Sequence, residues 1–301
     1  MASPLRADTA AAPASGPPAV AAPSRRRRAR RHLPWFSGTV LGMFVLTGLV
    51  GPFVAPYDPQ QIDLANALKA PLGWGGAAKH PFGTDELGRD VLTRMIYGAR
   101  VALQVSLAAV VLAGIVGLAV AVVAGYRGGR LDAFLMRTTD ASLAFPVLLF
   151  AIVVVGVFGP SARNVVIILA IAGWPSYARV LRSEVLRVKT MDYVTMARTM
   201  GGSARWVVRR HILPNIVPTL LVLVSLQLGL AIIAEGSLSF LGLGVPPPAP
   251  SWGGMLSDGR KHLDDGWWLP TLPGIALSLT VLATNMMGDW LRVNNDPTTR
   301  R

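Results

Sequence analysis

The residues that could carry catalysis in this chain are few and far apart. No cysteine occurs among the 301 residues, and the four histidines lack the spacing of a metal-binding motif. They are His32, His80, His211 and His262. Gly83 and Gly88 match the start of a phosphate-binding loop, but Arg89-Asp90 follows where lysine and a hydroxyl residue are needed. The motifs of metalloproteases and serine hydrolases do not occur in the sequence. The sequence therefore predicts a non-catalytic protein that has no metal or cofactor site and does not hydrolyse ATP.

One ionisable residue, Glu235, lies within or beside an apolar segment. Carboxylates at membrane depth are energetically expensive and are often functional. Two roles for Glu235 stay open at this point. It could form a hydrogen bond with an adjacent loop, or it could line the path of a solute.

The segment 192–215 is short and basic, and it lies between two long apolar stretches. Its first half places four apolar residues at helical spacing on one face: Tyr193, Met196, Ala197 and Met200. Gly201-Gly202 should end this helix, and Ser203 can cap a second one. That second helix should end at Leu213-Pro214, because proline removes a backbone hydrogen bond. Two short amphipathic helices in one loop indicate a surface that binds another protein.

The composition indicates a membrane protein. The chain is 52% hydrophobic and only 15% charged, whereas ordinary soluble domains are roughly 25% charged. Because about 20 apolar residues cross a bilayer core, the sequence predicts an all-α polytopic membrane protein with six transmembrane helices. These are 36–55, 101–124, 141–158, 165–181, 217–234 and 272–290. We expect Gly173-Trp174-Pro175 to interrupt the fourth of them.

The distribution of charge gives the orientation. If both termini are cytoplasmic, 21 of the 29 Lys and Arg residues lie on the cytoplasmic side, as the positive-inside rule requires. The net charge of +13 is then explained by basic residues on the cytoplasmic side of a lipid membrane. We therefore expect no binding to nucleic acid. The segment 192–215 is cytoplasmic, whereas 56–94 and 237–270 form long outside loops. Trp252, Trp267 and Trp268 in the second loop are expected to anchor it at the membrane interface, the alternative being a lip that meets an extracytoplasmic ligand or partner.

The N-terminal residues 1–34 are rich in alanine, proline and arginine, which predicts a disordered basic cytoplasmic tail. A twin-arginine export signal is the alternative, but Val54-Ala55-Pro56 is not a typical cleavage site. We therefore expect a retained first transmembrane helix, which lies with an outside loop in 35–79. A core domain follows over 80–297, and 298–301 is a second cytoplasmic tail.

Four strings in the core resemble the C-type inner-membrane permease subunits of ATP-binding-cassette importers of the dipeptide/oligopeptide/nickel class. They are GTDELGRDVLTRMIYGAR at 83–100, the segment 192–215, SLSFLGLG at 237–244 and NMMGDWLRVNNDP at 285–297. The similarity covers about residues 80–297. It implies the type I transmembrane fold of these importers in the cytoplasmic (inner) membrane of a bacterial-type cell.

The resemblance also implies a role for the loop 192–214, which corresponds to the EAA motif that docks on the ATPase subunits. The motif positions are Thr195, Met196 and Ala197, followed by Gly201 and Leu213-Pro214. Thr195 stands where the family usually has glutamate, which removes an anionic contact. The implied partners are a second permease subunit, two ATPase subunits that bind ATP and magnesium, and an extracytoplasmic binding protein.

The resemblance leaves the identity of the transported solute open. It implies peptides as the first expectation and nickel or another small solute as the second. A secondary transporter is the alternative class, for which broken helices and intramembrane charges would be expected.

Overall fold

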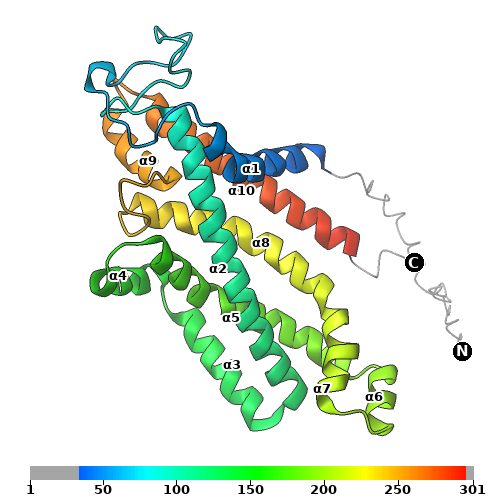
Figure 1. Cartoon of the computed structure of the whole chain (residues 1–301). Helices are drawn as coiled ribbons and strands as arrows, with labels where there is room; N and C mark the ends of the chain where they lie inside the picture. Colours follow the sequence, from blue (N-terminus) through cyan, green and yellow to red (C-terminus); the bar gives the residue numbers. More distant parts are fainter. Residues whose placement is uncertain (1–33, 296–301) are drawn as a thin grey trace, which may run out of the picture. The chain divides into compact units, whose positions relative to one another are not determined.

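The computed structural model describes residues 34–295, which contain helices and turns but no extended strand beyond one isolated bridge between Thr84 and Asp90 (Figure 1). The predicted tails are 1–34 and 298–301. Except for Pro34, they lie outside the described residues. The long helices are α1 (Trp35–Val54), α2 (Val91–Arg127), α5 (Ala162–Lys189), α8 (Leu213–Phe240) and α10 (Trp268–Asn295). The shorter elements are η1 (Leu64–Asn66), α3 (Gly129–Ala144), α4 (Val147–Phe158), α6 (Asp192–Thr199), α7 (Ala204–Val207), η2 (Val208–Ile212), α9 (Trp252–Gly259) and η3 (Arg260–His262).

Five helical stretches in the described residues are long and apolar enough to cross a membrane, and a sixth crossing is possible if α3 and α4 count as one. This confirms the all-α polytopic class. The helix bounds differ most for the second span, which begins at Val91 rather than at residue 101. The reason is that the side chain of Asp90 caps α2 by accepting a hydrogen bond from the Thr93 backbone N–H.

The third predicted span, 141–158, is wrong as a single helix. The chain bends by 83° between α3 and α4, and Phe145 at the bend has extended backbone angles. Pro146 causes this break, because a residue before proline is disfavoured in the helical conformation. The 12 residues of α4 extend only about 18 Å, which is too short to cross a bilayer core of roughly 30 Å.

The predicted interruption of the fourth span is also wrong. Helix α5 is continuous from Ala162 to Lys189, and Pro175 lies buried inside it. A proline removes one backbone hydrogen bond, and packing against neighbouring helices lets a membrane helix tolerate that loss. This removes the broken helix that had favoured a secondary transporter.

Helix α5 packs closely along α2. A Cβ atom added at Gly117 of α2 would lie 2.4 Å from the Tyr177 Cβ atom and 2.7 Å from the Trp174 carbonyl oxygen. Small residues at such contacts let two helix backbones approach, which is how many membrane helices associate.

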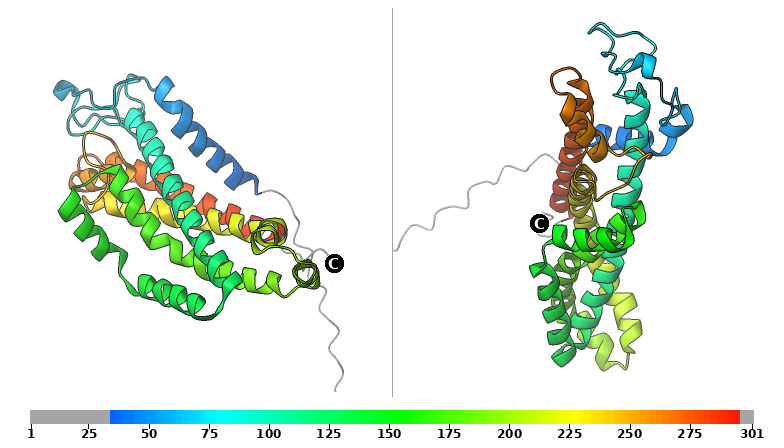
Figure 2. Two further views of the ribbon diagram at one scale, coloured as in Figure 1. Left: turned by 60° about the horizontal axis from the view of Figure 1, so that its bottom comes forward. Right: turned by 90° about the vertical axis from the view of Figure 1, so that its left-hand side faces the viewer.

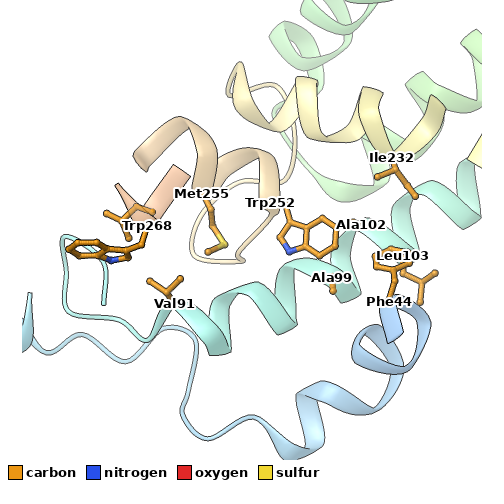
Figure 3. Packing of buried hydrophobic residues seen from close by; sticks show 10 residues of the cluster. Phe44, Val91, Ala99, Ala102, Leu103, Ile232, Trp252, Met255 and Trp268 are labelled. Atoms are coloured by element: carbon orange, nitrogen blue, oxygen red, sulfur yellow. The ribbon is translucent and has the colours of Figure 1, made fainter. Parts of the chain in front are cut away.

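Helix α2 joins the two ends of the bundle, which lie about 55 Å apart if its 37 residues are straight. At the beginning of α2, Val91 packs in an apolar cluster with Trp252 and Met255 of α9 and Trp268 of α10 (Figure 3). At its other end, Tyr126 packs in a cluster beneath α6 and α7. The loop 192–214 and the loops around α9 thus lie at opposite ends (Figures 1 and 2).

Two of the three tryptophans assigned to the membrane interface are instead buried in the protein. Trp252 and Trp268 are each 4% exposed. The Trp252 indole N–H donates to the Met95 carbonyl at 3.0 Å, and the Trp268 indole N–H donates to the Thr84 carbonyl at 3.2 Å. These side chains fasten the loops at this end to one another and to α2, which sequence position alone could not reveal.

Candidate functional site

Helix α6 forms as predicted and ends at a glycine. Gly201 has φ +85°, and the pattern that closes the helix is a Schellman motif. The Gly201 N–H donates to the Arg198 carbonyl at 3.1 Å, and the Gly202 N–H donates to the Ala197 carbonyl at 3.0 Å. Nothing lies within 4 Å of a Cβ atom added at Gly201, so backbone conformation, and not space, is what requires glycine there.

The second helix begins as expected but does not end at Pro214. The Ser203 hydroxyl oxygen accepts a hydrogen bond from the Trp206 backbone N–H and so caps α7. A π-helical turn, η2, then leads directly into α8, with the Leu213 N–H bonded to the Val208 carbonyl. Pro214 stands in the first turn of α8, where a missing N–H costs little. The prediction that Leu213-Pro214 ends the helix is therefore wrong, because the π-helical turn η2 connects α7 to α8 without a break.

The inner side of this loop is anchored in an apolar cluster. Val194 of α6 and Val207 of α7 are fully buried, and they pack with residues from the end of α5, from η2 and from the beginning of α8. Those residues are Val185, Val188, Ile212 and Ile216. One cluster therefore joins α6 to two long helices through packed side chains.

The outer side of α6 carries exposed apolar side chains. Tyr193, Met196 and Met200 are 40%, 62% and 85% exposed, and Trp206 of α7 is 50% exposed. We call these four residues the exposed apolar face. Ala197, which the sequence placed on the same face, is partly buried and packs on the cluster around Val194 instead. Thr195 is exposed, so its replacement of glutamate leaves the fold of this chain undisturbed.

His211 supports the exposed apolar face from within. Its ring centroid lies 5.0 Å from that of Trp206 and 5.9 Å from that of Tyr193. The sequence interpretation did not include His211 or Trp206 in the face, since the turn at 201–203 separates them from α6. The sequence signal that could have identified His211 and Trp206 was their aromatic character in an otherwise basic segment.

Lys189 ties the end of α5 to the end of α2 beside this loop. Its Nζ atom donates to the Tyr126 carbonyl at 2.6 Å and to the Gly125 carbonyl at 3.3 Å. A cation at a helix C-terminus satisfies free carbonyl groups and interacts favourably with the helix dipole. The helix ends that pack beneath α6 therefore include those of α2, α5 and α8.

Glu235 is 1% exposed near the opposite end of α8. Its carboxylate accepts a hydrogen bond from the Ser239 hydroxyl at 2.8 Å, and the Ser239 oxygen in turn accepts from the Val245 N–H at 3.4 Å. Ser239 lies on the same helix, so Glu235 is connected to the following loop only through the Ser239 hydroxyl, and the predicted direct bond to that loop stays a prediction. A role in the solute path stays a prediction.

The string 83–90 has a structural explanation. One oxygen of Asp85 accepts hydrogen bonds from the Leu87 and Arg89 N–H groups, and its other oxygen pairs with Arg89 Nε at 2.7 Å. At Gly88, φ is +75° and an added Cβ atom would lie 1.7 Å from the Asp63 carbonyl oxygen. The glycine and the acid therefore form a tight turn that leads into α2, which accounts for the apparent half of a phosphate-binding loop.

A histidine links two loops at this end. The His262 Nε2 atom lies 3.0 Å from a Glu86 carboxylate oxygen, and its Nδ1 atom lies 3.3 Å from an Asp265 oxygen. The hydrogen bond to Glu86, with the nearby Asp265 charge, raises the pKa of His262 above its ordinary value of 6.5. The protonated form therefore stabilises the folded protein.

We expect this stabilisation to be complete below about pH 6.5 and to be lost as pH rises through the higher folded pKa. Because the groups are partly exposed, the effect on the melting temperature Tm should be about 2 °C or less. Thermal unfolding in detergent between pH 5 and pH 9 should show it in the native protein. The same scan of His262→Gln, which does not titrate, should lack this component, and an identical pH profile for both would contradict the assignment.

The long apolar helices and the exposed apolar face at one end define a multi-pass membrane protein that works with a partner. Residues 93–301 match the family described as binding-protein-dependent transport system inner membrane component. Residues 24–71 match the N-terminal transmembrane domain of oligopeptide transport permease C. The chain thus belongs to the binding-protein-dependent inner-membrane permease family, as a transport subunit and not as the ATPase.

Curated relatives agree with this assignment, and a solved structure shares the fold. The di/tripeptide transport system permease protein DppC of Pseudomonas aeruginosa is 41% identical over 257 residues, which cover 85% of this chain and 84% of that protein. The dipeptide transport system permease protein DppC of Bacillus subtilis is 36% identical, with 91% and 85% covered. The inward-facing MetNI methionine ABC transporter matches with a TM-score of 0.54 at 18% identity, over 66% of this chain and 95% of that chain, which shows a shared fold.

Proposed function

We propose that this chain forms half of the translocation path of an ATP-driven importer for di- or oligopeptides. A second permease subunit supplies the other half, two ATPase subunits bind ATP and magnesium, and an extracytoplasmic binding protein delivers the peptide. Both termini lie in the cytoplasm. The peptide-permease names of the relatives support the solute class, and the positive-inside distribution supports the orientation.

The observation that carries this proposal is the two-sided construction of α6. Its outer side offers exposed apolar side chains to a groove, as amphipathic helices do when they dock. Its inner side is packed against the ends of α5 and α8. Closure of the ATPase subunits on ATP would move α6, and the shared cluster would carry that movement to the membrane-crossing helices. The two states must differ in contact free energy for such a coupling to work.

Purification in mild detergent tests the proposal. An importer permease should retain an ATPase subunit and a second permease subunit, and cells that contain the complex should take up radiolabelled dialanine only while ATP is available. Uptake by the isolated chain driven by an ion gradient would instead identify a secondary transporter. ATP-dependent uptake of Ni²⁺ without uptake of peptides would retain the coupling and reject the solute class.

A further inference from the structure

A cavity of about 250 Å³ lies between α2, α5 and α8. Small residues form much of its wall, among them Ala109 and Ala113 of α2 and Gly173 of α5. Ser176, Tyr177 and Gln227 also line it. Tyr177 and Gln227 lie near the middle of α5 and α8, so the cavity is at mid-depth of the membrane-crossing bundle.

The polar groups of this cavity are unusual for their depth. Tyr177 is 1% exposed, and its hydroxyl has no hydrogen-bond partner among the described residues. The Gln227 Nε2 atom lies 4.0 Å from the position of a Cβ atom added at Gly173, so its carboxamide faces α5. Buried hydroxyl and amide groups are nearly always hydrogen-bonded in folded proteins. A buried hydroxyl without a partner within the protein points to a partner that is not part of this chain.

The chemistry of the lining selects the kind of partner. All the described residues that line the cavity are uncharged. A hydroxyl and a carboxamide can each donate and accept, which suits an amide group better than an ion. An amide in transit at membrane depth needs hydrogen bonds, but a site on a path must also release what it binds. Neutral groups meet both conditions, because they bind less strongly than charged ones.

We propose that this cavity is a transit site for the amide groups of the transported solute, with the Tyr177 hydroxyl and the Gln227 carboxamide as its hydrogen-bonding groups. This inference rests on the proposed import of peptides and names the part of the path that this subunit contributes. It assigns the path to the middle of α5 and α8, and Glu235 does not line the cavity although the adjacent Ala234 does.

The absence of cysteine from the chain allows a direct test, because one substitution introduces its only thiol. Ser176→Cys should react with a small methanethiosulfonate reagent in the purified importer complex, and saturating dialanine should slow that reaction about threefold or more. The matched control is Ser225→Cys on α8, since the Ser225 hydroxyl bonds to the Val222 carbonyl and the residue does not line the cavity. Dialanine should leave the reaction of the control unchanged. Labelling is read on this chain by mass.

Uptake kinetics give the second readout. In cells that lack the native gene, Tyr177→Phe and Gln227→Met should each raise the KM for dialanine uptake about threefold to tenfold, the loss expected for one neutral hydrogen bond. Both variants should retain the ATPase subunits, because the loop 192–214 is untouched. Tyr177→Phe should be at least as heat-stable as the native protein, since it removes a hydroxyl that has no partner.

The outcomes separate this inference from the proposed function. Unprotected Ser176→Cys and an unchanged KM in both variants, beside normal ATP-dependent uptake by the native chain, would overturn the transit site and leave the importer assignment intact. A native complex that does not transport dialanine would overturn the peptide assignment, and the transit site with it.

Discussion

Replacing Met196 and Met200 together by glutamate is expected to lower retention of the ATPase subunits about a hundredfold and to reduce solute uptake to background. The two side chains are 62% and 85% exposed on one side of α6, so the carboxylates would face water in the free chain and should not disturb its fold. In an apolar groove, each substitution loses the burial of a methionine side chain, worth about 1.5–3 kcal/mol. Two such losses exceed the roughly 2.7 kcal/mol that corresponds to a hundredfold change in affinity.

The measurement is quantitative co-purification in mild detergent, with radiolabelled dialanine uptake as the functional readout. The matched control is the pair Met196→Leu and Met200→Leu, which keeps the apolar character and similar volume. It should retain at least half of the native ATPase signal. If the glutamate pair retained as much ATPase as the leucine pair at equal membrane abundance, the exposed apolar face would not be the docking surface.

The same loop shows what local sequence can and cannot predict. Helical spacing predicted α6, and local chemistry predicted its end at Gly201 and the cap at Ser203, because these depend on residues close in sequence. The direction in which α6 faces was predicted less well. Val194 and Ala197 turn inward because α5 and α8 present apolar residues there, and those contacts come from other parts of the chain.

Three wrong expectations about the helices involve a proline. Pro146 breaks a predicted span, Pro175 leaves α5 continuous, and Pro214 stands in the first turn of α8. Each proline removes one hydrogen-bond donor, which costs little in the first turn of a helix, as at Pro214, and more in the interior of a helix, as at Pro175. The outcome depends on whether neighbouring helices hold the flanking residues, and hydropathy along the sequence does not contain that information.

The cavity and the loop also differ in how visible they are in the sequence. The residues of the exposed apolar face lie within a few helical turns of one another in the sequence. Ser176 and Gln227 are instead separated by a loop and come together only when α5 packs beside α8. Lys189 is a similar case, because its carbonyl partners at Gly125 and Tyr126 lie on α2. Long-range pairing of this kind connects the loop 192–214 to the proposed path through α5 and α8.

Gly201→Val is expected to reduce uptake at least tenfold without reducing the amount of protein in the membrane. At φ +85° a β-branched residue is a strong outlier, and a residue forced into such a conformation costs about 1–3 kcal/mol. The substitution meets no steric obstacle, since nothing lies within 4 Å of the added Cβ atom. The chain should relieve the strain by opening the Schellman hydrogen bonds of Gly201 and Gly202. Helix α6 would then lose its fixed angle to α7, and the exposed apolar face would no longer present Met196 and Trp206 together.

Gly201→Asn separates this explanation from a simple effect of size. Asparagine tolerates the left-handed conformation far better than valine, although the two side chains are similar in volume. The asparagine variant should therefore keep uptake within about threefold of the native chain and should retain its ATPase subunits, whereas the valine variant should lose both. Equal loss in the two variants would show that the space beside Gly201 is occupied by the partner, and equal activity would show that the angle between α6 and α7 does not matter for coupling. Only a difference between them supports a loop whose backbone geometry transmits the movement of the ATPase.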